Sequence, residues 1–262
     1  MRFSPLLMVC LSLLFCACRE EQTLFEKVSS ARSGIDFNNR IVENDTINPT
    51  DVVNVYNGGG VGIGDFNNDG LQDLFFTGNM VPCRLYLNKG SFSFDDVTEQ
   101  AGVEGMGRWA RGVSVVDINN DGLQDIYICN TIYKDSLRRR NILYINKGVE
   151  NGIPRFEDKA AEYGLDIHVQ STMGNFFDYD NDGDLDFFLT ANEATSEINP
   201  SAFGKNSNTR KDRGTGRLYR NDKSPQLNHP VFTEVSARAG LTLDGYGHGA
   251  TITDINNDGW KD

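Results

Sequence analysis

The chain has 262 residues, a length that suits one large β domain or two small ones. Its formal charge of −12 makes it a poor electrostatic partner for phosphate backbones, which argues against nucleic-acid binding. Glycine is abundant, at 27 residues, and this favours turns between many short strands.

Residues 1–18 have the composition of a targeting segment. Arg2 is a minimal basic start, and residues 6–15 form an apolar run that is too short to span a bilayer. The run ends in Phe-Cys-Ala-Cys, which resembles the lipobox of bacterial lipoproteins and makes Cys18 the expected lipid anchor. The Arg-Glu-Glu that follows resembles the signal that sends some Bacteroidetes lipoproteins to the cell surface. We therefore expect an outer-membrane lipoprotein that contacts the membrane through this anchor alone; ordinary secretion is the alternative.

A nine-residue segment rich in Asp, Asn and Gly occurs four times, beginning at Asp65, Asp117, Asp178 and Asp254. Each copy places oxygen-bearing side chains at positions 1, 3, 5 and 9 and a glycine at position 6. Ca²⁺ takes about six to eight oxygen ligands in a flexible shell, and glycine permits the sharp turn. One such loop is more often a plain turn, but four copies with the same carboxylate spacing predict calcium sites.

The candidate ligands are the side chains at positions 1, 3, 5 and 9 and the carbonyl at position 7. In chain order they are Asp65, Asn67, Asp69, Leu71, Asp73, Asp117, Asn119, Asp121, Leu123, Asp125, Asp178, Asp180, Asp182, Asp184, Asp186, Asp254, Asn256, Asp258, Trp260 and Asp262. Because 14 of the 37 acidic residues lie in these loops, the acidity of the chain is explained by cation binding rather than by disorder.

The segments that flank the loops predict β-strands rather than helices. An EF-hand would place a bidentate Glu at position 12, where this chain has Phe76, Ile128 or Leu189 within a short apolar run. Each loop also belongs to a longer unit of four expected strands, of which the first is rich in small residues because innermost strands approach closely. The expected strands are residues 59–64, 74–76, 84–88 and 94–103; 110–116, 126–128, 141–146 and 156–165; 171–177, 185–189, 217–221 and 232–241; and 249–253.

Four antiparallel strands per unit, with successive loops 52, 61 and 76 residues apart, indicate an all-β fold built from β-propeller blades. With these motifs the chain resembles the FG-GAP/VCBS repeat family, whose repeat also builds the integrin α-subunit propeller. Tyr-Asn-Gly-Gly-Gly-Val at 56–61, Leu-Tyr-x-Asn in the third strand and Phe-x-Asp-Val-Thr in the fourth resemble ASPIC/UnbV-type secreted proteins of Bacteroidetes. The resemblance covers residues 24–262 and implies calcium in the loops on one face of a propeller.

The expected ring is incomplete. Residues 56–262 hold about three blades and the start of a fourth, which stops inside its calcium loop. Residues 25–35 repeat the fourth-strand pattern with no unit ahead of them, so we expect the segment 19–55 to supply a closing strand to a final blade. An open array would expose a long sheet edge, and we therefore interpret the sequence as a piece of a longer protein, truncated at its C-terminus.

Two enlarged connections between second and third strands, residues 131–140 and 193–216, are basic in an otherwise acidic chain. Extended loops on a rigid scaffold are the usual place for recognition, and they favour an anionic glycan or a protein as ligand. Charged loops that simply stay solvated are the alternative. The candidate ligand-face residues are Lys134, Arg138, Arg139, Arg140, Arg210, Lys211 and Arg213.

The sequence therefore predicts a calcium-binding propeller lipoprotein that acts as an extracellular binding or adhesion module. A lyase-type enzyme acting on polysaccharides and a structural propeller domain of a larger protein remain alternatives. No catalytic residue is assigned, because His168, His229 and His248 lie far apart without metal-ligand spacing or a nucleophile motif. Cys83 and Cys129 leave two possibilities open, a disulfide or two buried thiols.

Overall fold

The computed structural model describes residues 24–52, 54–192, 216–223, 226–241 and 247–262, and these form three four-stranded antiparallel sheets. In each sheet, consecutive strands are hydrogen-bonded neighbours. The strands are β1 (Val61–Gly64), β2 (Asp73–Phe76), β3 (Arg84–Asn88) and β4 (Phe94–Asp96); β5 (Ala110–Val116), β6 (Asp125–Asn130), β7 (Ile142–Glu150) and β8 (Ile153–Asp158); and β9 (Ser171–Phe177), β10 (Asp186–Ala191), β11 (Arg217–Asp222) and β12 (Val231–Glu234).

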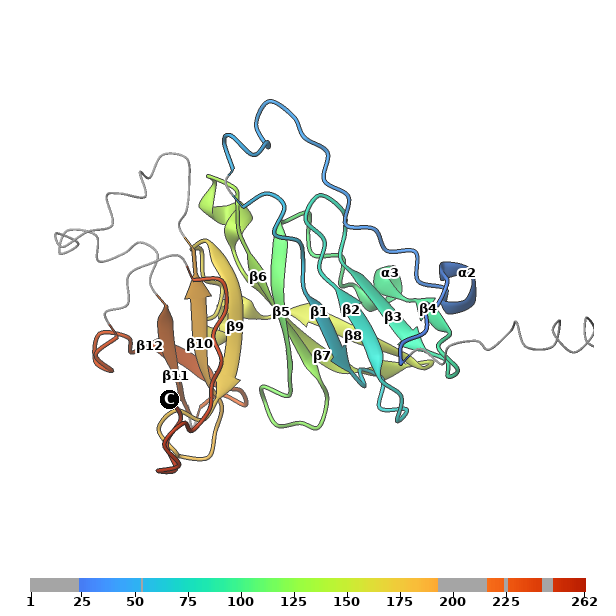
Figure 1. Ribbon diagram of the computed structural model, residues 1–262. Coiled ribbons are helices and arrows are strands. Elements are labelled where there is room, and N and C mark those ends of the chain that lie inside the picture. Colours follow the sequence, from blue (N-terminus) through green and yellow to red (C-terminus); the bar gives the residue numbers. More distant parts are fainter. Residues whose placement is uncertain (1–23, 53, 193–215, 224–225, 242–246) are drawn as a thin grey trace, which may run out of the picture.

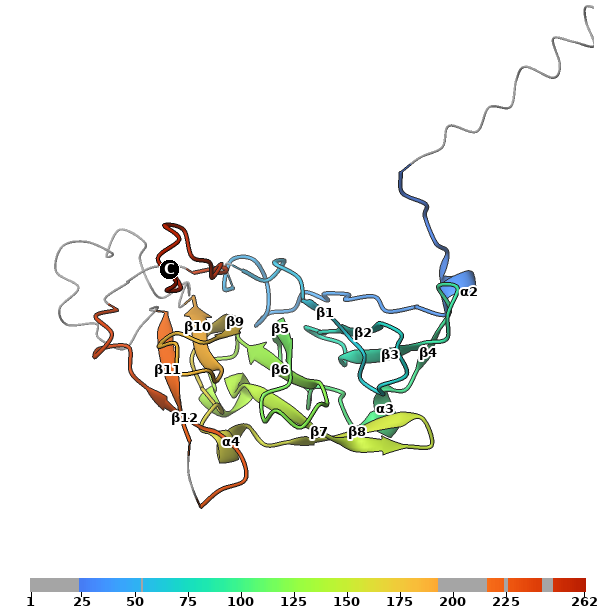
Figure 2. The same cartoon turned by 90° about the horizontal axis from the view of Figure 1, so that it is seen from below.

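The sheets stand side by side like blades, with their first strands β1, β5 and β9 against one another and their fourth strands outermost (Figures 1 and 2). At Gly112, on β5, a Cβ atom would lie 3.0 Å from the Cα of Met173 on β9 and closer still to the Thr172 carbonyl oxygen. A side chain there would therefore force two backbones apart. The expected all-β architecture of four-stranded blades is confirmed, in a ring that does not close within the described residues.

The apolar core lies between the blades. Ile126 and Ile142 of the second sheet pack with Phe75 and Leu85 of the first, and all four side chains are fully buried. The other face of the second sheet packs in the same way against the third sheet. Alternate side chains of a strand point to opposite faces, so the middle sheet contributes to both clusters.

The prediction that each fourth strand continues to residues 103, 165 and 241 is wrong in its second half. The chain leaves the ladder after β4 and β8 and forms the single helical turns α3 (Thr98–Ala101) and α4 (Ala160–Tyr163), each followed by a left-handed glycine. In the first blade, Asp96 Oδ1 accepts hydrogen bonds from both the amide and the hydroxyl of Thr98. Such local side-chain bonds compete with the ladder, and a left-handed glycine ends the turn.

The expected closing strand is not seen as a strand. Within residues 24–35 the regular element is the helical turn α2 (Ser30–Ser33), whose N-cap is Ser29 and whose C-cap is Gly34. Gly34 packs against the Phe94 carbonyl of β4, just as Gly164 after α4 packs against the Phe232 carbonyl of β12. The segment thus takes the position of the turn that follows a blade. Pairing of residues 25–29 with a final blade stays a prediction.

Residues 249–253 are likewise not assigned as a strand. Thr253 nevertheless exchanges backbone hydrogen bonds with Asp262, at 2.7 and 3.5 Å. Among the described residues, none of the helices has the length and apolar character of a membrane span. The targeting segment and Cys18 lie outside the described residues.

Candidate metal centres

Three of the four repeated loops connect the first and second strands of a sheet and lie at the same end of the blades, the lower end in Figure 1. Adjacent loops touch. Asn68 Nδ2 of the first loop donates to the Gly122 carbonyl of the second at 3.3 Å, and Asn181 Nδ2 of the third donates to the Gly259 carbonyl of the fourth at 3.3 Å. The four loops therefore share one face of the molecule.

All four loops have the same backbone conformation. The asparagine at position 4 is left-handed in every copy, with φ of 55° at Asn68 and 60° at Asn257, and the glycine at position 6 has φ between 83° and 89°. Asparagine tolerates this region better than most side chains, and glycine enters it without steric cost. The repeated sequence thus specifies a repeated turn.

The carboxylate at position 1 organises each loop. In the first copy, Asp65 Oδ1 accepts from the Asp69 amide at 3.0 Å, and Asp65 Oδ2 accepts from the Gly70 amide at 2.8 Å. Asp69 Oδ1 in turn accepts from the Leu71 amide at 2.9 Å. The same bonds recur in the other three loops. Backbone amides of each loop therefore fix the orientation of the carboxylates at positions 1 and 5.

The carboxylate at position 9 is buried beneath the loop. Asp125 is fully buried, and its two oxygens accept from the Ile118 amide at 3.1 Å and the Asn146 amide at 2.8 Å. Burial raises the pKa of Asp125 to about 7, with smaller contributions from Asp121 and Asp117, although the two amides lower it. A buried carboxylate beside two others carries a desolvation cost that a bound cation would offset.

Asp73 and Asp186 have the same surroundings, and burial raises the pKa of each to about 6. Each buried carboxylate receives an amide from the asparagine that ends the Leu-Tyr-x-Asn motif of the third strand, which is Asn88, Asn146 or Asn221. The same asparagines donate side-chain hydrogen bonds to the carbonyl at position 8. The sequence showed this motif as a repeat, but its supporting role under the loop was missed.

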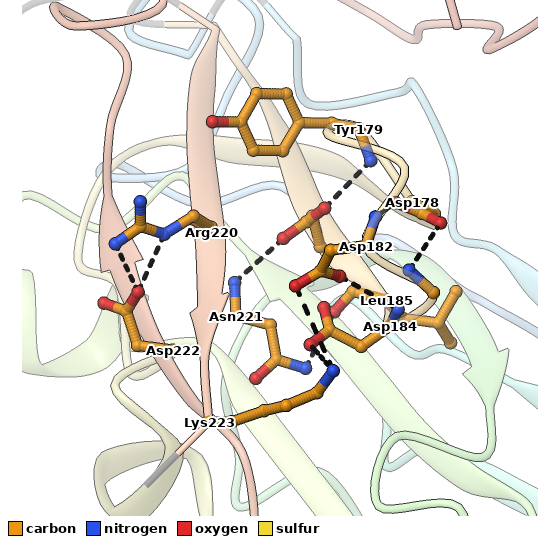
Figure 3. Close-up of polar contacts among 11 residues, drawn as sticks. Asp178, Tyr179, Asp182, Asp184, Leu185, Arg220, Asn221, Asp222 and Lys223 are labelled. Atoms are coloured by element: carbon orange, nitrogen blue, oxygen red, sulfur yellow. Dashed lines mark hydrogen bonds and ion pairs between the residues drawn. The ribbon is translucent and has the colours of Figure 1, made fainter. Parts of the chain in front are cut away.

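The third loop has the highest charge, because it adds Asp180 at position 3 and Asp184 at position 7. Figure 3 shows Asp184 beside Asp182 and Lys223. Carboxylate oxygens of Asp178, Asp180 and Asp186 lie within 4.8 Å of one another. One buried oxygen of Asp180 has no hydrogen-bond partner. In the second loop, by contrast, Asn119 Nδ2 donates to Asp121 Oδ2 at 2.9 Å. The third loop thus has an unpaired buried carboxylate oxygen where the other loops carry an amide.

Lys223, directly after β11, lies at the edge of this third loop. Its Nζ is 3.0 Å from Asp184 Oδ2 and 4.0 Å from Asp182 Oδ2 (Figure 3). Arg220 lies nearby but donates to Asp222 at 2.7 Å. Lys223 was missed from the sequence, although a predicted antiparallel blade already places the end of the third strand beside the start of the second, where the loop ends.

The basic residues predicted as a ligand face lie at the opposite end of the blades, in the connection between β6 and β7. This connection contains the single turn η1 (Ser136–Arg139) at the upper end in Figure 1. The Arg138 guanidinium lies 3.4 Å from the centre of the Tyr133 ring, and Arg139 donates to the carbonyls of Tyr133 and His168. Lys134 is exposed in the same connection. Arg210, Lys211 and Arg213 lie outside the described residues.

The remaining sequence candidates have ordinary structural surroundings. Cys83 and Cys129 are free and buried, so the alternative of two thiols is the one that the structure shows. His229 stacks on Tyr163 with ring centres 4.6 Å apart, and His248 lies 3.4 Å from the Asn192 amide. The three histidines are not brought together.

Comparisons with known proteins find the same repeat that carries the four loops. A family model described as FG-GAP-like repeat matches residues 65–128, which contain the first two loops. The chain is 28% identical over 212 residues to cartilage acidic protein 1 of Xenopus tropicalis, and 28% identical over 212 residues to that of Homo sapiens. Each alignment covers 80% of this chain but 29% and 28% of the respective relative, so the chain spans less than a third of the length of these curated relatives. The FG-GAP part of the predicted resemblance is confirmed, and the bacterial lipoprotein part is not tested.

Proposed function

We propose that this chain is a calcium-stabilised repeat domain that acts as an extracellular binding module. The observation that carries the calcium assignment is the third loop. Its carboxylates converge within 4.8 Å, and the buried oxygen of Asp180 has no donor in the described part of the chain. Buried charges are normally paired or coordinate metals, and an all-oxygen donor set suits a hard cation such as Ca²⁺.

In each loop the ion would be held by the side chains at positions 1, 3, 5 and 9 and the carbonyl at position 7. In the third loop these are Asp178, Asp180, Asp182, Asp184 and Asp186. The loop joins the innermost strand of a blade to the strand beside it, so the ion fixes the strand connection and performs no chemistry. At about 100-fold excess over its dissociation constant, each ion that binds the folded state alone adds about 2.7 kcal/mol to stability.

The extracellular location rests on the targeting segment and on this calcium chemistry. Calcium sites of extracellular modules bind with dissociation constants of about 10⁻⁴ to 10⁻³ M. Anchoring through Cys18 at the outer membrane is the proposal that the lipobox resemblance supports. The binding role rests on the basic connection that carries Arg138, Arg139 and Arg140, at the end of the blades away from the loops.

Thermal unfolding in excess Ca²⁺ and in EDTA tests the calcium assignment, with Mg²⁺ as the competing hard cation. We expect a cooperative transition whose midpoint rises by many degrees with Ca²⁺ and much less with Mg²⁺, which demands a stricter octahedral geometry. Calorimetric titration should show heat from several sites. A cooperative transition with the same midpoint in Ca²⁺ and EDTA would mean that the loops are ordinary turns, and it would contradict the proposal.

A further inference from the structure

A cavity of about 560 Å³ opens between the first two blades at the end opposite the calcium loops. Its walls come from the β2–β3 connection, with Met80 and Pro82, and from the β4–β5 connection, with Met106 and Arg108. Tyr133 and Tyr144 of the second blade complete it. Binding sites for small molecules typically have volumes of about 300 to 1,000 Å³ and a few polar groups set among apolar ones.

The polar groups of this cavity are mainly donors. The half-buried Arg108 donates through Nη1 to the Arg140 carbonyl at 2.7 Å and contacts the Met106 sulfur at 3.4 Å, which leaves its Nε–H without an acceptor in the described part of the chain. Tyr144 is only 2% exposed, and its hydroxyl accepts from the Gly105 amide at 3.2 Å and donates to no acceptor among the described residues. Glu104 is the one carboxylate among the lining residues, and it is exposed.

The positive charge around the cavity is not neutralised by ion pairs. Across the described ranges, Arg108, Arg138, Arg139 and Arg140 have no carboxylate oxygen within 4.0 Å, and the buried Nε of Arg140 has no hydrogen-bond partner. Burial is the largest influence on the pKa of Arg108 and lowers it, while Asp158 acts in the opposite direction. Asp158 Oδ1 accepts hydrogen bonds from the amides of Leu143 and Ala160. Of these residues Arg108 lines the cavity, so an anion there would gain the charge and the unused Nε–H of Arg108.

The lip of the cavity is held in a costly conformation. Met106 has φ of +56° between two left-handed glycines, and the Arg108 amide closes the turn by donating to the Gly105 carbonyl at 3.2 Å. Left-handed backbone is unfavourable for a long side chain, and such strain concentrates at ligand-binding positions. The turn leaves the Met106 side chain 53% exposed at the cavity mouth.

We propose that this cavity binds an acidic oligosaccharide through the carboxylate of a uronic-acid residue. Arg108 and the Tyr144 hydroxyl would bind the carboxylate, and Met80, Met106 and the Tyr133 ring would contact the apolar face of the sugar ring. A partly apolar cavity of about 560 Å³ suits one or two sugar units better than the broad surface of an acidic protein. The proposal rests on the binding role proposed above and names the ligand class for that face.

The test is calorimetric titration of the chain with trigalacturonate, in Ca²⁺ and in EDTA. The comparison ligands are the methyl-esterified trimer, which is neutral, and a short polyglutamate peptide. We expect binding of the free acid, no binding of the ester and weak binding of the peptide. Equal binding of acid and ester, or preferential binding of the peptide, would overturn the sugar-acid assignment.

Three variants locate the site. Arg108→Gln should weaken trigalacturonate binding by about tenfold or more, because a charge-assisted hydrogen bond is lost. Met106→Glu places a repelling carboxylate on an exposed side chain, so it should abolish binding without disturbing the fold. Lys89→Gln makes the same charge change as Arg108→Gln at an exposed turn between β3 and β4, and should leave binding unchanged. Undiminished binding by Met106→Glu would overturn the location.

The two proposals fail separately. If Ca²⁺ raises the unfolding midpoint but trigalacturonate does not bind, the sugar-acid site is wrong and the calcium assignment stands. If trigalacturonate binds but Ca²⁺ has no effect on unfolding, the calcium assignment is wrong and the cavity proposal stands.

Discussion

Replacing Asp180 by asparagine should have opposite effects on stability with and without calcium. In the third loop, the Asp180 carboxylate lies with those of Asp178 and Asp186 inside a 4.8 Å cluster, and one of its oxygens is buried without a partner. In the other loops an asparagine occupies this position and donates to the aspartate at position 5 at 2.9 to 3.0 Å. Asp180→Asn therefore removes a repelling charge and supplies a donor for Asp182.

The magnitude follows from the geometry. Two unit charges about 4.8 Å apart repel by about 0.9 kcal/mol in water, so relief from two neighbours contributes about 1.7 kcal/mol before screening. The new hydrogen bond adds about 0.5–1.5 kcal/mol. We expect Asp180→Asn to stabilise the calcium-free protein by about 1–3 kcal/mol, which raises the midpoint by about 3–8 °C for a chain of this size.

In saturating calcium the same change removes an anionic ligand. A tenfold loss of affinity at this site lowers stability by about 1.4 kcal/mol, so the calcium-induced rise in midpoint should shrink. The assay is thermal unfolding in EDTA and in excess Ca²⁺, with calorimetric affinities for Ca²⁺. Asn119→Asp in the second loop is the matched control, since it adds a charge and removes the 2.9 Å donor to Asp121. It should destabilise the protein in EDTA.

Two results would refute this reasoning. The first is a lower midpoint of Asp180→Asn in EDTA, which would mean that the carboxylate is paired in a way that stabilises the fold without metal. The second is an unchanged calcium affinity, which would mean that position 3 does not contribute a ligand.

The remaining predictions concern the loop edge, the blade interface and the thiols. Lys223→Gln should raise the affinity of the third loop for Ca²⁺ severalfold in calorimetry, because it removes a competing cation 3.0 Å from Asp184; a weaker site would show that Lys223 organises the loop. Gly112→Ala should lower the unfolding midpoint by about 5–12 °C even in saturating calcium, since overpacking against backbone costs about 2–3 kcal/mol or more; an unchanged midpoint would contradict the packing of β5 against β9. Cys83 and Cys129 should resist iodoacetamide in the native protein and react after unfolding, because burial raises the pKa of Cys83 to about 11 and that of Cys129 further; fast labelling of the native protein would show that the blades open.

Sequence reasoning predicted those features that depend on nearby residues. These are the glycine turn of each loop, the spacing of its carboxylates and the short strands on either side. The left-handed asparagine and the bonds from amides four and five residues ahead are equally local, but they were not predicted. A pattern that recurs four times therefore predicts the turn, and favours a cation site, from composition and spacing. The predicted length of the fourth strand was wrong because local side-chain hydrogen bonds that compete with strand pairing were overlooked. In the first blade these are the bonds from Thr98 to Asp96, which end the strand.

The tertiary structure decided the features that depend on distant residues. Asn146 donates to the carbonyl of Phe66, 80 positions away, and so ties the floor of the second loop to the first blade. Lys223, after β11, forms an ion pair with Asp184 in the loop between β9 and β10. Arg108, in the connection between the first two blades, donates a hydrogen bond to the Arg140 carbonyl of the second blade. The Asn146 and Arg108 contacts depend on how neighbouring blades stack, whereas the Lys223 contact depends on the order of strands within the third blade. The sequence by itself therefore determined the loops and their carboxylates. The arrangement of strands within a blade and the stacking of blades decided which charges are paired, which are buried and where the cavity lies.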